Sequence, residues 1–257
     1  MNARQTWIAL WTIVVREVRR FTRIWPQTLL PPSITMTMYF IIFGSLIGSR
    51  IGEMDGVPYM SYIVPGLIMM SVITNSYSNV ASSFFSNKFQ RSVEELIVSP
   101  MPNWVIMMGF VAGGVARGLG VGIIVTAVSL FFTHLDVVHP LLTIAIVIMT
   151  AVLFSIGGFI NALLAHKFDD ISIVPIFVLT PLTYLGGVFY SIHTLPAFWQ
   201  HVSLINPILY MVNTFRFGIL GVSDINVGVA IAAIAAFIVV FYMVGLWCLQ
   251  QGKGLRS

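Results

Sequence analysis

The chain has 257 residues, of which 58% are hydrophobic and only 9% are charged, and its formal net charge is +4. Soluble domains carry about 25% charged residues, so this composition supplies too few charges to cover a surface that faces water. Together with a mean hydropathy of +0.93, it excludes a soluble protein and predicts a membrane protein. The single cysteine, Cys248, excludes an intramolecular disulfide framework and a metal site built from several cysteines.

Residues 1–25 predict an amphipathic helix at the membrane interface. Apolar residues repeat at helical spacing on one face: Trp7, Leu10, Trp11, Val14, Val18 and Phe21. Arginines lie mostly away from that face: Arg4, Arg16, Arg19, Arg20 and Arg23. We expect the aromatic face among the lipid headgroups and the arginines toward anionic lipid or a partner. The alternative is a charged extension that only anchors the first span.

Charge-free runs predict six membrane-spanning helices within one transmembrane domain, residues 26–257. The runs are long enough to supply the about 20 apolar residues that a crossing helix needs. We place the spans at residues 29–48, 61–84, 104–133, 141–165, 171–190 and 226–249. With both termini in the cytoplasm, most lysines and arginines lie on the cytoplasmic side, which agrees with the positive-inside rule. Arg50 and Arg216 then face outside.

The loop after the second predicted span, residues 87–103, is the first segment that breaks the apolar pattern. It has a polar start, an amphipathic middle and two closing prolines, Pro100 and Pro102. The middle predicts a short helix along the membrane surface that leaves Glu94 and Glu95 available to a cytoplasmic partner. A solvated loop is the alternative.

Arg117 is a cation inside the third predicted span, surrounded by glycines. Charged residues in spans usually face the interior of a helix bundle or a wet cavity, and small residues let helices approach closely. Asn75 and Asn79, in the second predicted span, raise the same two alternatives. The three residues are expected either to line a translocation path or to pack helices against one another.

Residues 192–224, between the last two predicted spans, are apolar but interrupted by prolines. Broken backbone at membrane depth is tolerated only against protein or a wet cavity. We therefore expect amphipathic or re-entrant helical pieces at the outer surface.

Several kinds of chemistry are missing from the sequence. No lysine ends a glycine-rich turn before Ser or Thr, so the chain has no P-loop for ATP. All nine acidic residues, Glu17 included, map to predicted loops or ends, which disfavours a carrier coupled to protons or sodium. No nucleophile elbow and no zinc-binding histidine pair occur. The chain is therefore not expected to be an enzyme, to bind a metal or to bind nucleic acid.

Two stretches resemble the membrane-spanning subunit of ABC-2 type bacterial ABC transporters. Residues 89–100, FQRSVEELIVSP, are similar to the coupling-helix segment of that family, in which a Glu-x-Leu-x-x-Ser/Thr-Pro run follows a basic residue. Residues 185–216 resemble a second family pattern of spaced Gly-Gly, Leu-Pro, Pro-Ile, Tyr and Arg. The resemblance covers nearly the whole chain. It departs from many members at Gln90 and at Ser92 and Val93, where they have an acidic residue and Gly-Thr.

The resemblance implies an all-α fold of six transmembrane helices, with an N-terminal interface helix, a cytoplasmic coupling helix and short re-entrant helices before the last span. We expect the following residues, the last two in a neighbouring cytoplasmic loop, to couple the chain to an ATPase: Arg91, Glu94, Glu95, Leu96, Pro100, Asp169 and Asp170. The outer re-entrant segment is expected to use Gly186, Gly187, Pro196, Pro207, Tyr210 and Arg216.

The implied function is that of the permease subunit of an ATP-binding cassette exporter in the bacterial inner membrane. Such a subunit crosses the membrane several times, forms the translocation path and pairs with a copy of itself or with a close relative. ATP and magnesium are expected on a separate ATP-binding subunit, and no cofactor on this chain. An ATPase-independent membrane channel or scaffold is the alternative from another class.

Overall fold

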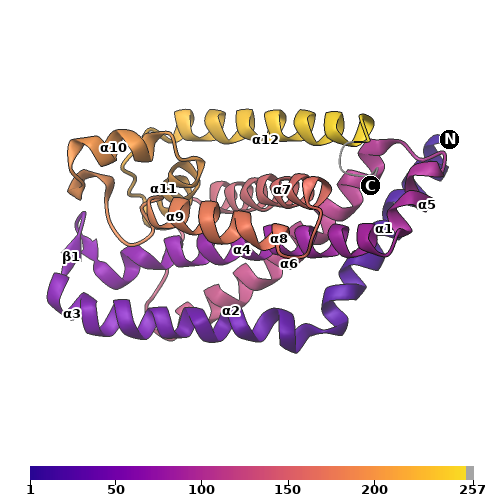
Figure 1. The fold of residues 1–257 in the computed structure, drawn as a ribbon. Coiled ribbons are helices and arrows are strands. Elements are labelled where there is room, and N and C mark those ends of the chain that lie inside the picture. The colour runs from indigo at the N-terminus through magenta and orange to yellow at the C-terminus, as the bar shows by residue number, and fades with distance from the viewer. Residues whose placement is uncertain (253–257) are drawn as a thin grey trace.

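The computed structural model describes residues 1–252, except for the side chains of Ser45, Glu94 and Ile97. Nearly all of this part of the chain is helical, and most of the long helices run roughly along one axis of an elongated bundle (Figure 1). One end of the bundle carries the start of the first helix, the end of the last helix and the short helix α5 (Ser92–Val98) (Figure 1). We call it the α5 end. The opposite end carries a small β-hairpin, and we call it the β1 end.

The N-terminal part of the chain forms two consecutive helical rods. The first is α1 (Ala3–Arg23), which lies at an angle to the bundle axis (Figure 1). The second runs the length of the bundle and consists of α2 (Trp25–Tyr39), the π-helical segment η1 (Phe40–Ile47) and α3 (Gly48–Ile51).

An antiparallel hairpin, which is not among the predicted elements, follows at the β1 end. Its strands are β1 (Glu53–Met54) and β2 (Val57–Pro58). The two linking residues, Asp55 and Gly56, have φ values of 50° and 77°. Two successive positive φ values are what a tight hairpin turn requires, and Asp-Gly is a favoured pair for that turn.

Helix α4 (Tyr59–Phe89) is the longest helix and lies at the centre of the bundle. It packs against α6 (Asn103–Ser129) and α7 (Pro140–Leu164), and large side chains such as Tyr62, Phe84 and Phe85 are buried along it. Its 31 residues correspond to about 46 Å. That length exceeds the roughly 30 Å of a bilayer's hydrocarbon core.

A shorter rod and several short helices complete the chain. The rod runs from Asp170 to Tyr184 and consists of α8 (Asp170–Val174), the π-helical segment η2 (Pro175–Leu179) and α9 (Thr180–Tyr184). The following elements are η3 (Ile192–Thr194), α10 (Ala197–Leu204), α11 (Pro207–Leu220) and α12 (Val227–Gln250).

Four helices of the described chain are long and apolar enough to cross a membrane: Trp25–Ile51, Asn103–Ser129, Pro140–Leu164 and Val227–Gln250. They agree with four of the predicted spans and make the chain a multi-pass membrane protein. The span predicted at 171–190 is shorter as a helix, because the rod ends at Tyr184 and Gly187 adopts a φ of 70°. The rod has 15 residues, or about 22 Å.

Glycines bring α6 into close contact with two neighbours. A Cβ atom at Gly109 would lie 2.5 Å from Cγ2 of Ile13, and one at Gly113 would lie 2.5 Å from Cβ of Glu17. These two glycines, four residues apart, form the small-xxx-small surface that seats α1.

The adjacent face of α6 meets α4 in the same way. A Cβ atom at Gly114 would lie 2.4 Å from Cγ2 of Val80, and one at Gly118 would lie 1.8 Å from Oγ of Ser76. Helix α6 therefore lies between α1 and α4, and a larger residue at these positions requires a neighbouring side chain or helix to shift.

Candidate functional sites

Helix α5 forms where the sequence predicts a short helix. Arg91 precedes it with a left-handed φ of 59°, which turns the chain sharply after α4. Val93 is 1% exposed and packs into the apolar cluster at this end of the bundle, and Leu96 lies against the same cluster. The hydroxyl of Ser99 donates a hydrogen bond to the carbonyl oxygen of Leu96 at 2.6 Å. The helix is thus fixed to the bundle through one face.

The opposite face of α5 is open to solvent or a partner. Arg91, Glu95 and Pro100 are exposed, and Val98 is 87% exposed. Four of the predicted coupling residues therefore lie on this segment, three of them exposed and Leu96 half-buried. The side chain of the fifth, Glu94, lies outside the described part of the structure.

The loop between α7 and α8 lies beside the end of α4. The ammonium group of Lys88 donates hydrogen bonds to the carbonyl oxygens of Leu163 at 2.8 Å and Ala165 at 2.5 Å. The ring of Phe168 contacts the rings of Phe85 and Phe89, with centroids 4.9 and 5.1 Å apart. These contacts join the ends of α4 and α7.

The side-chain carboxylate of Asp170 holds the backbone of this loop in place. Its Oδ2 accepts hydrogen bonds from the backbone N–H groups of His166 at 2.8 Å and Lys167 at 2.9 Å. These bonds stabilise the carboxylate and hold the pKa of Asp170 below its ordinary value. The neighbouring predicted residue, Asp169, is exposed.

Charged and apolar residues are thus exposed together at the α5 end. We define the coupling surface as the exposed residues Phe89, Arg91, Glu95, Val98, Phe168 and Asp169. Phe89 is 66% exposed and Phe168 is 49% exposed. Exposed apolar side chains mixed with charges are typical of a protein-binding surface.

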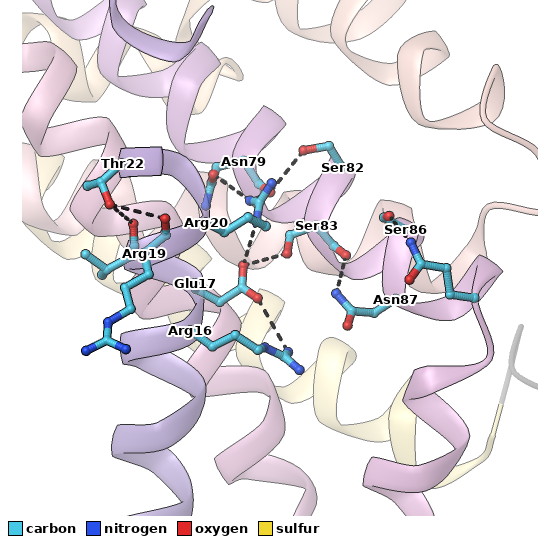
Figure 2. Close-up of polar contacts among 12 residues, drawn as sticks. Arg16, Glu17, Arg19, Arg20, Thr22, Asn79, Ser82, Ser83, Ser86 and Asn87 are labelled. Carbon is cyan, nitrogen blue, oxygen red and sulfur yellow. Dashed lines mark hydrogen bonds and ion pairs between the residues drawn. The ribbon is translucent and has the colours of Figure 1, made fainter. Parts of the chain in front are cut away.

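A polar network joins α1 to α4 (Figure 2). At its centre lies Glu17, which is 1% exposed. The hydroxyl of Ser83 donates a hydrogen bond to Oε2 of Glu17 at 2.5 Å. Arg20 and Arg16 form ion pairs with the same carboxylate at 3.3 and 3.4 Å. Glu17, which the sequence places in the N-terminal helix outside the predicted spans, is therefore enclosed between α1 and α4.

Two asparagines on α4 hold arginines from two other helices. Nη2 of Arg20 donates to Oδ1 of Asn79 at 2.8 Å and to the Asn79 carbonyl oxygen at 3.1 Å. Nη2 of Arg117 donates to Oδ1 of Asn75 at 3.2 Å. The structure thus brings together the three residues Asn75, Asn79 and Arg117, and adds Arg20 to them. Their roles in a path or in helix packing stay predictions.

Helix α1 divides its residues between lipid and protein, with Glu17 buried and Arg20 half-buried. Trp7 and Trp11 are 65% and 58% exposed, which fits the expected lipid-facing aromatic face. Phe21, predicted on that same face, is 7% exposed and packs within the protein. The three buried residues of α1, Ile13, Glu17 and Phe21, follow one another at intervals of four residues. This spacing places them on one side of the helix and is the sequence signal for a face that packs against protein.

At the β1 end, Arg216 joins three elements. It was expected to face outside, but it is 0% exposed. Its Nη2 donates to the carbonyl oxygen of Gly187 at 2.6 Å and its Nε to that of Tyr62 at 3.2 Å. The guanidinium carbon lies 3.9 Å from the centroid of the Tyr62 ring. Arg216 therefore links α11 to α4 and to the turn at Gly187. Backbone carbonyl oxygens and the face of an aromatic ring take the place of the water molecules that would otherwise solvate its guanidinium group.

The other residues predicted for the outer segment lie in the turns and helix ends around Arg216. A Cβ atom at Gly186 would lie 2.7 Å from Cγ2 of Ile208. Pro196 precedes α10 and Pro207 begins α11, where a missing N–H costs nothing. The hydroxyl of Tyr210 donates to the carbonyl oxygen of Leu204 at 2.6 Å.

Asp224 and Asn213, which the sequence reasoning did not single out, tie the same region together. Asp224 accepts hydrogen bonds from the Ser191 hydroxyl and the Ile192 N–H, both at 3.0 Å. The N–H of Asp224 donates to Oδ1 of Asn213 at 3.0 Å. No sequence spacing indicated these contacts, since they join residues far apart in the chain.

Known proteins support the resemblance found in the sequence. The family model described as ABC-2 type transporter matches residues 8–220. The chain is 60% identical over 252 residues, 98% of each chain, to the inner membrane transport permease YadH of Escherichia coli strain K12. It is 25% identical over 248 residues, 95% of this chain and 93% of the relative, to nodulation protein J of Rhizobium meliloti strain 1021. The chain belongs to the ABC-2 type transporter family and is a multi-pass permease subunit of an ABC transporter in the inner membrane.

Proposed function

We propose that this permease works in export, that a separate subunit hydrolyses the ATP, and that two copies of the chain enclose the path. The observation that carries the proposal is the coupling surface. It presents apolar and charged residues side by side at the end of α4, the central helix.

The ATPase is proposed to bind the coupling surface. Val93 anchors α5 in the same apolar cluster that holds Phe85 and Leu163, so a push on α5 acts directly on α4 and α7. Asp169 and Asp170 offer the second contact, beside the lysine that links the ends of these helices. ATP and magnesium would be held by the partner subunit.

The proposed topology has six spans and both termini in the cytoplasm. The start of α1 and the end of α12 lie at the α5 end (Figure 1). The same end carries three cations: Lys88, Arg91 and Lys167. An excess of lysine and arginine is typical of the cytoplasmic side. The fifth and sixth crossings are assigned to α4 and to the rod from Asp170 to Tyr184. The short helices α10 and α11 would then be the re-entrant pieces.

A polar face of α4 supports the proposed dimer and path. Thr74 is exposed, and Ser78 and Ser82 follow it at intervals of four residues on one helical face. Ser78 and Ser82 also line a groove of 310 Å³ with Ser172. Hydroxyl groups gain nothing from contact with lipid tails, so we assign this face to a wet path closed by a second copy.

The direction of transport is proposed from the outer connections. The hairpin of β1 and β2 and the segment 130–139 are both short, and neither provides a domain that captures a ligand from outside. A substrate taken from the cytoplasm or the inner leaflet needs no such domain.

The Glu95→Lys variant tests the coupling role. Reversing the charge on the exposed face of α5 is expected to lower ATP-driven transport in proteoliposomes by about tenfold, the effect of losing one charge-assisted contact. Membrane insertion should not change, because Glu95 is exposed. Glu53→Lys, the same change at the exposed start of β1, is the control and should transport normally. Equal transport by both variants would contradict the proposal.

Co-purification separates the exporter from the alternative of an ATPase-independent channel or scaffold. A P-loop protein encoded beside this chain should bind the wild type and lose affinity for Glu95→Lys. If no P-loop protein binds the wild type, the alternative is favoured.

A further inference from the structure

Two arginines from different helices, Arg20 of α1 and Arg117 of α6, bind to α4 one helical turn apart. Asn75 and Asn79 are four residues apart, so their side chains are neighbours on the helix surface, about 5 to 6 Å apart. Each holds one guanidinium through its Oδ1, that of Arg117 at 3.2 Å and that of Arg20 at 2.8 Å. Two like charges are therefore held close together in a largely apolar bundle.

The carboxylate in this network does not neutralise the pair. Glu17 forms ion pairs with Arg16 and Arg20 and accepts from Ser83. Both ion pairs found in the described part of the chain involve this one carboxylate. Arg16, Arg20 and Arg117 carry three positive charges against one negative charge, so a net positive charge stays in the network.

The network also has unused donors and open space. Nε of Arg117 and Nδ2 of Asn79 are buried and have no hydrogen-bond partner, and Asn79 is 0% exposed. Gly120, one turn along α6 from Arg117, has nothing within 4 Å of the position of a Cβ atom. An incoming group therefore finds open space at Gly120, one helical turn from Arg117, and buried donors that need an acceptor.

We propose that Arg20 and Arg117 bind the phosphate of an anionic phospholipid from the inner leaflet. A phosphate between two guanidiniums relieves their repulsion and accepts several charge-assisted hydrogen bonds. Asn79 lies ten residues before the last residue of α4, about 15 Å along the helix. About 16 Å of α4 exceeds the hydrocarbon core. With that excess on the side of the α5 end, Asn79 lies at the boundary with the headgroups, and Asn75, four residues further in, lies about 6 Å below it. The choice of the inner leaflet rests on the proposed topology, whereas the contacts of the two arginines do not depend on it.

The experiment measures lipid binding, with no transport step, so it can fail independently of the proposed function. The full-length protein, purified in detergent, is titrated with phosphatidylglycerol, with phosphatidylcholine and with inorganic phosphate, and bound lipid is counted by native mass spectrometry. Phosphatidylglycerol should bind about tenfold more tightly than phosphatidylcholine, whose choline cation the arginines repel. Arg117→Gln should remove this preference. Arg19→Gln, the same change at an exposed position of α1, should keep it.

A second variant leaves both arginines in place. In Gly120→Leu the added Cβ has nothing within 4 Å, and the side chain beyond it takes up space next to Arg117, so the variant should also weaken phosphatidylglycerol binding about tenfold, at a Tm no lower than that of the wild type. Equal binding of the two lipids, or unchanged binding by both Arg117→Gln and Gly120→Leu, would overturn the proposal. Inorganic phosphate that displaces the lipid at similar concentrations would overturn it in favour of a site for a soluble anion.

Discussion

Buried charges define this protein at the scale of single residues. Glu17 and Arg216 are both within 1% of full burial, near opposite ends of the molecule. Each bonds to partners that are far away in the sequence: Glu17 accepts from Ser83, and Arg216 donates to the carbonyl oxygens of Tyr62 and Gly187, although its buried Nη1 has no hydrogen-bond partner among the described residues. A charge without such partners would be expelled from an apolar interior, so these contacts fix how α1 and α11 sit on α4.

Removing the hydroxyl that Glu17 accepts from should destabilise the α1–α4 contact. Ser83→Ala is expected to lower the free energy of unfolding by about 2 kcal/mol, because a hydrogen bond to a charged group is lost. Thermal unfolding in detergent measures the effect as a lower Tm. Ser82→Ala is the matched control on the same helix, since its hydroxyl bonds only to the Asn79 carbonyl of its own helix. A control that loses as much would contradict this account.

The carboxylate of Asp170 should make the stability of the α7–α8 loop depend on pH. Its pKa lies below the ordinary value of 3.8 in the folded protein, because two backbone N–H groups bind the charged form. A lowered folded pKa contributes stability above the unfolded pKa, and that stability is lost as the pH falls through the folded pKa.

Asp170→Asn is therefore expected to lower Tm at neutral pH and to match the wild type only once the pH has fallen below the lowered pKa of Asp170 in the folded protein. Asp169→Asn, which removes an exposed carboxylate from the same loop, is the matched control and should leave Tm at neutral pH close to that of the wild type. A difference between Asp170→Asn and the wild type that stays constant with pH would mean that the hydrogen bonds do not depend on the charge.

At the scale of elements, α6 is the helix whose sequence is most constrained. Its glycines are divided between two faces, one against α1 and the other against α4. Close approach of backbones allows van der Waals contact along the whole crossing, which drives helix association where no hydrophobic effect operates. Gly120, by contrast, has open space around it.

Gly118→Ala and Gly120→Ala should therefore have opposite effects. A Cβ atom at Gly118 would lie 1.8 Å from Oγ of Ser76, and we expect a loss of about 1 to 3 kcal/mol from overpacking. At Gly120, alanine should stabilise the helix by about 0.5 to 1 kcal/mol. Comparison of the two Tm values checks this, and Ser76→Ala should partly rescue Gly118→Ala. Equal Tm values of the two variants would contradict the close packing of α6 against α4 at Gly118.

At the scale of the whole molecule, α4 connects the sites. It bonds to Arg216 near the β1 end, carries Asn75, Asn79 and Ser83 in its second half, and ends at Lys88 beside the coupling surface. A rigid helix with buried contacts along its length transmits displacement at one end to the other. A movement of α5 would therefore reach the arginine pair and the β1 end through this one element.

Local composition was enough to predict much of this architecture. Four spans, the helix at residues 92–98 and the broken segment before the last span follow from runs of apolar residues, prolines and the few charges. These features depend on residues close together in the chain. The lipid solvent requires long apolar helices whatever the helices then pack against.

What the sequence could not decide is where a polar side chain points once helices meet. The burial of Glu17 depends on Ser83 and on the glycine at position 113, and the burial of Arg216 depends on a carbonyl in the turn at Gly187. The end of the rod at Tyr184, short of the predicted span, depends on that same turn. The sequence by itself determined that the chain is a multi-pass membrane protein and where its pattern breaks. Only the tertiary structure decided which charges are enclosed, because the free energy of a buried charge is set by partners from other helices.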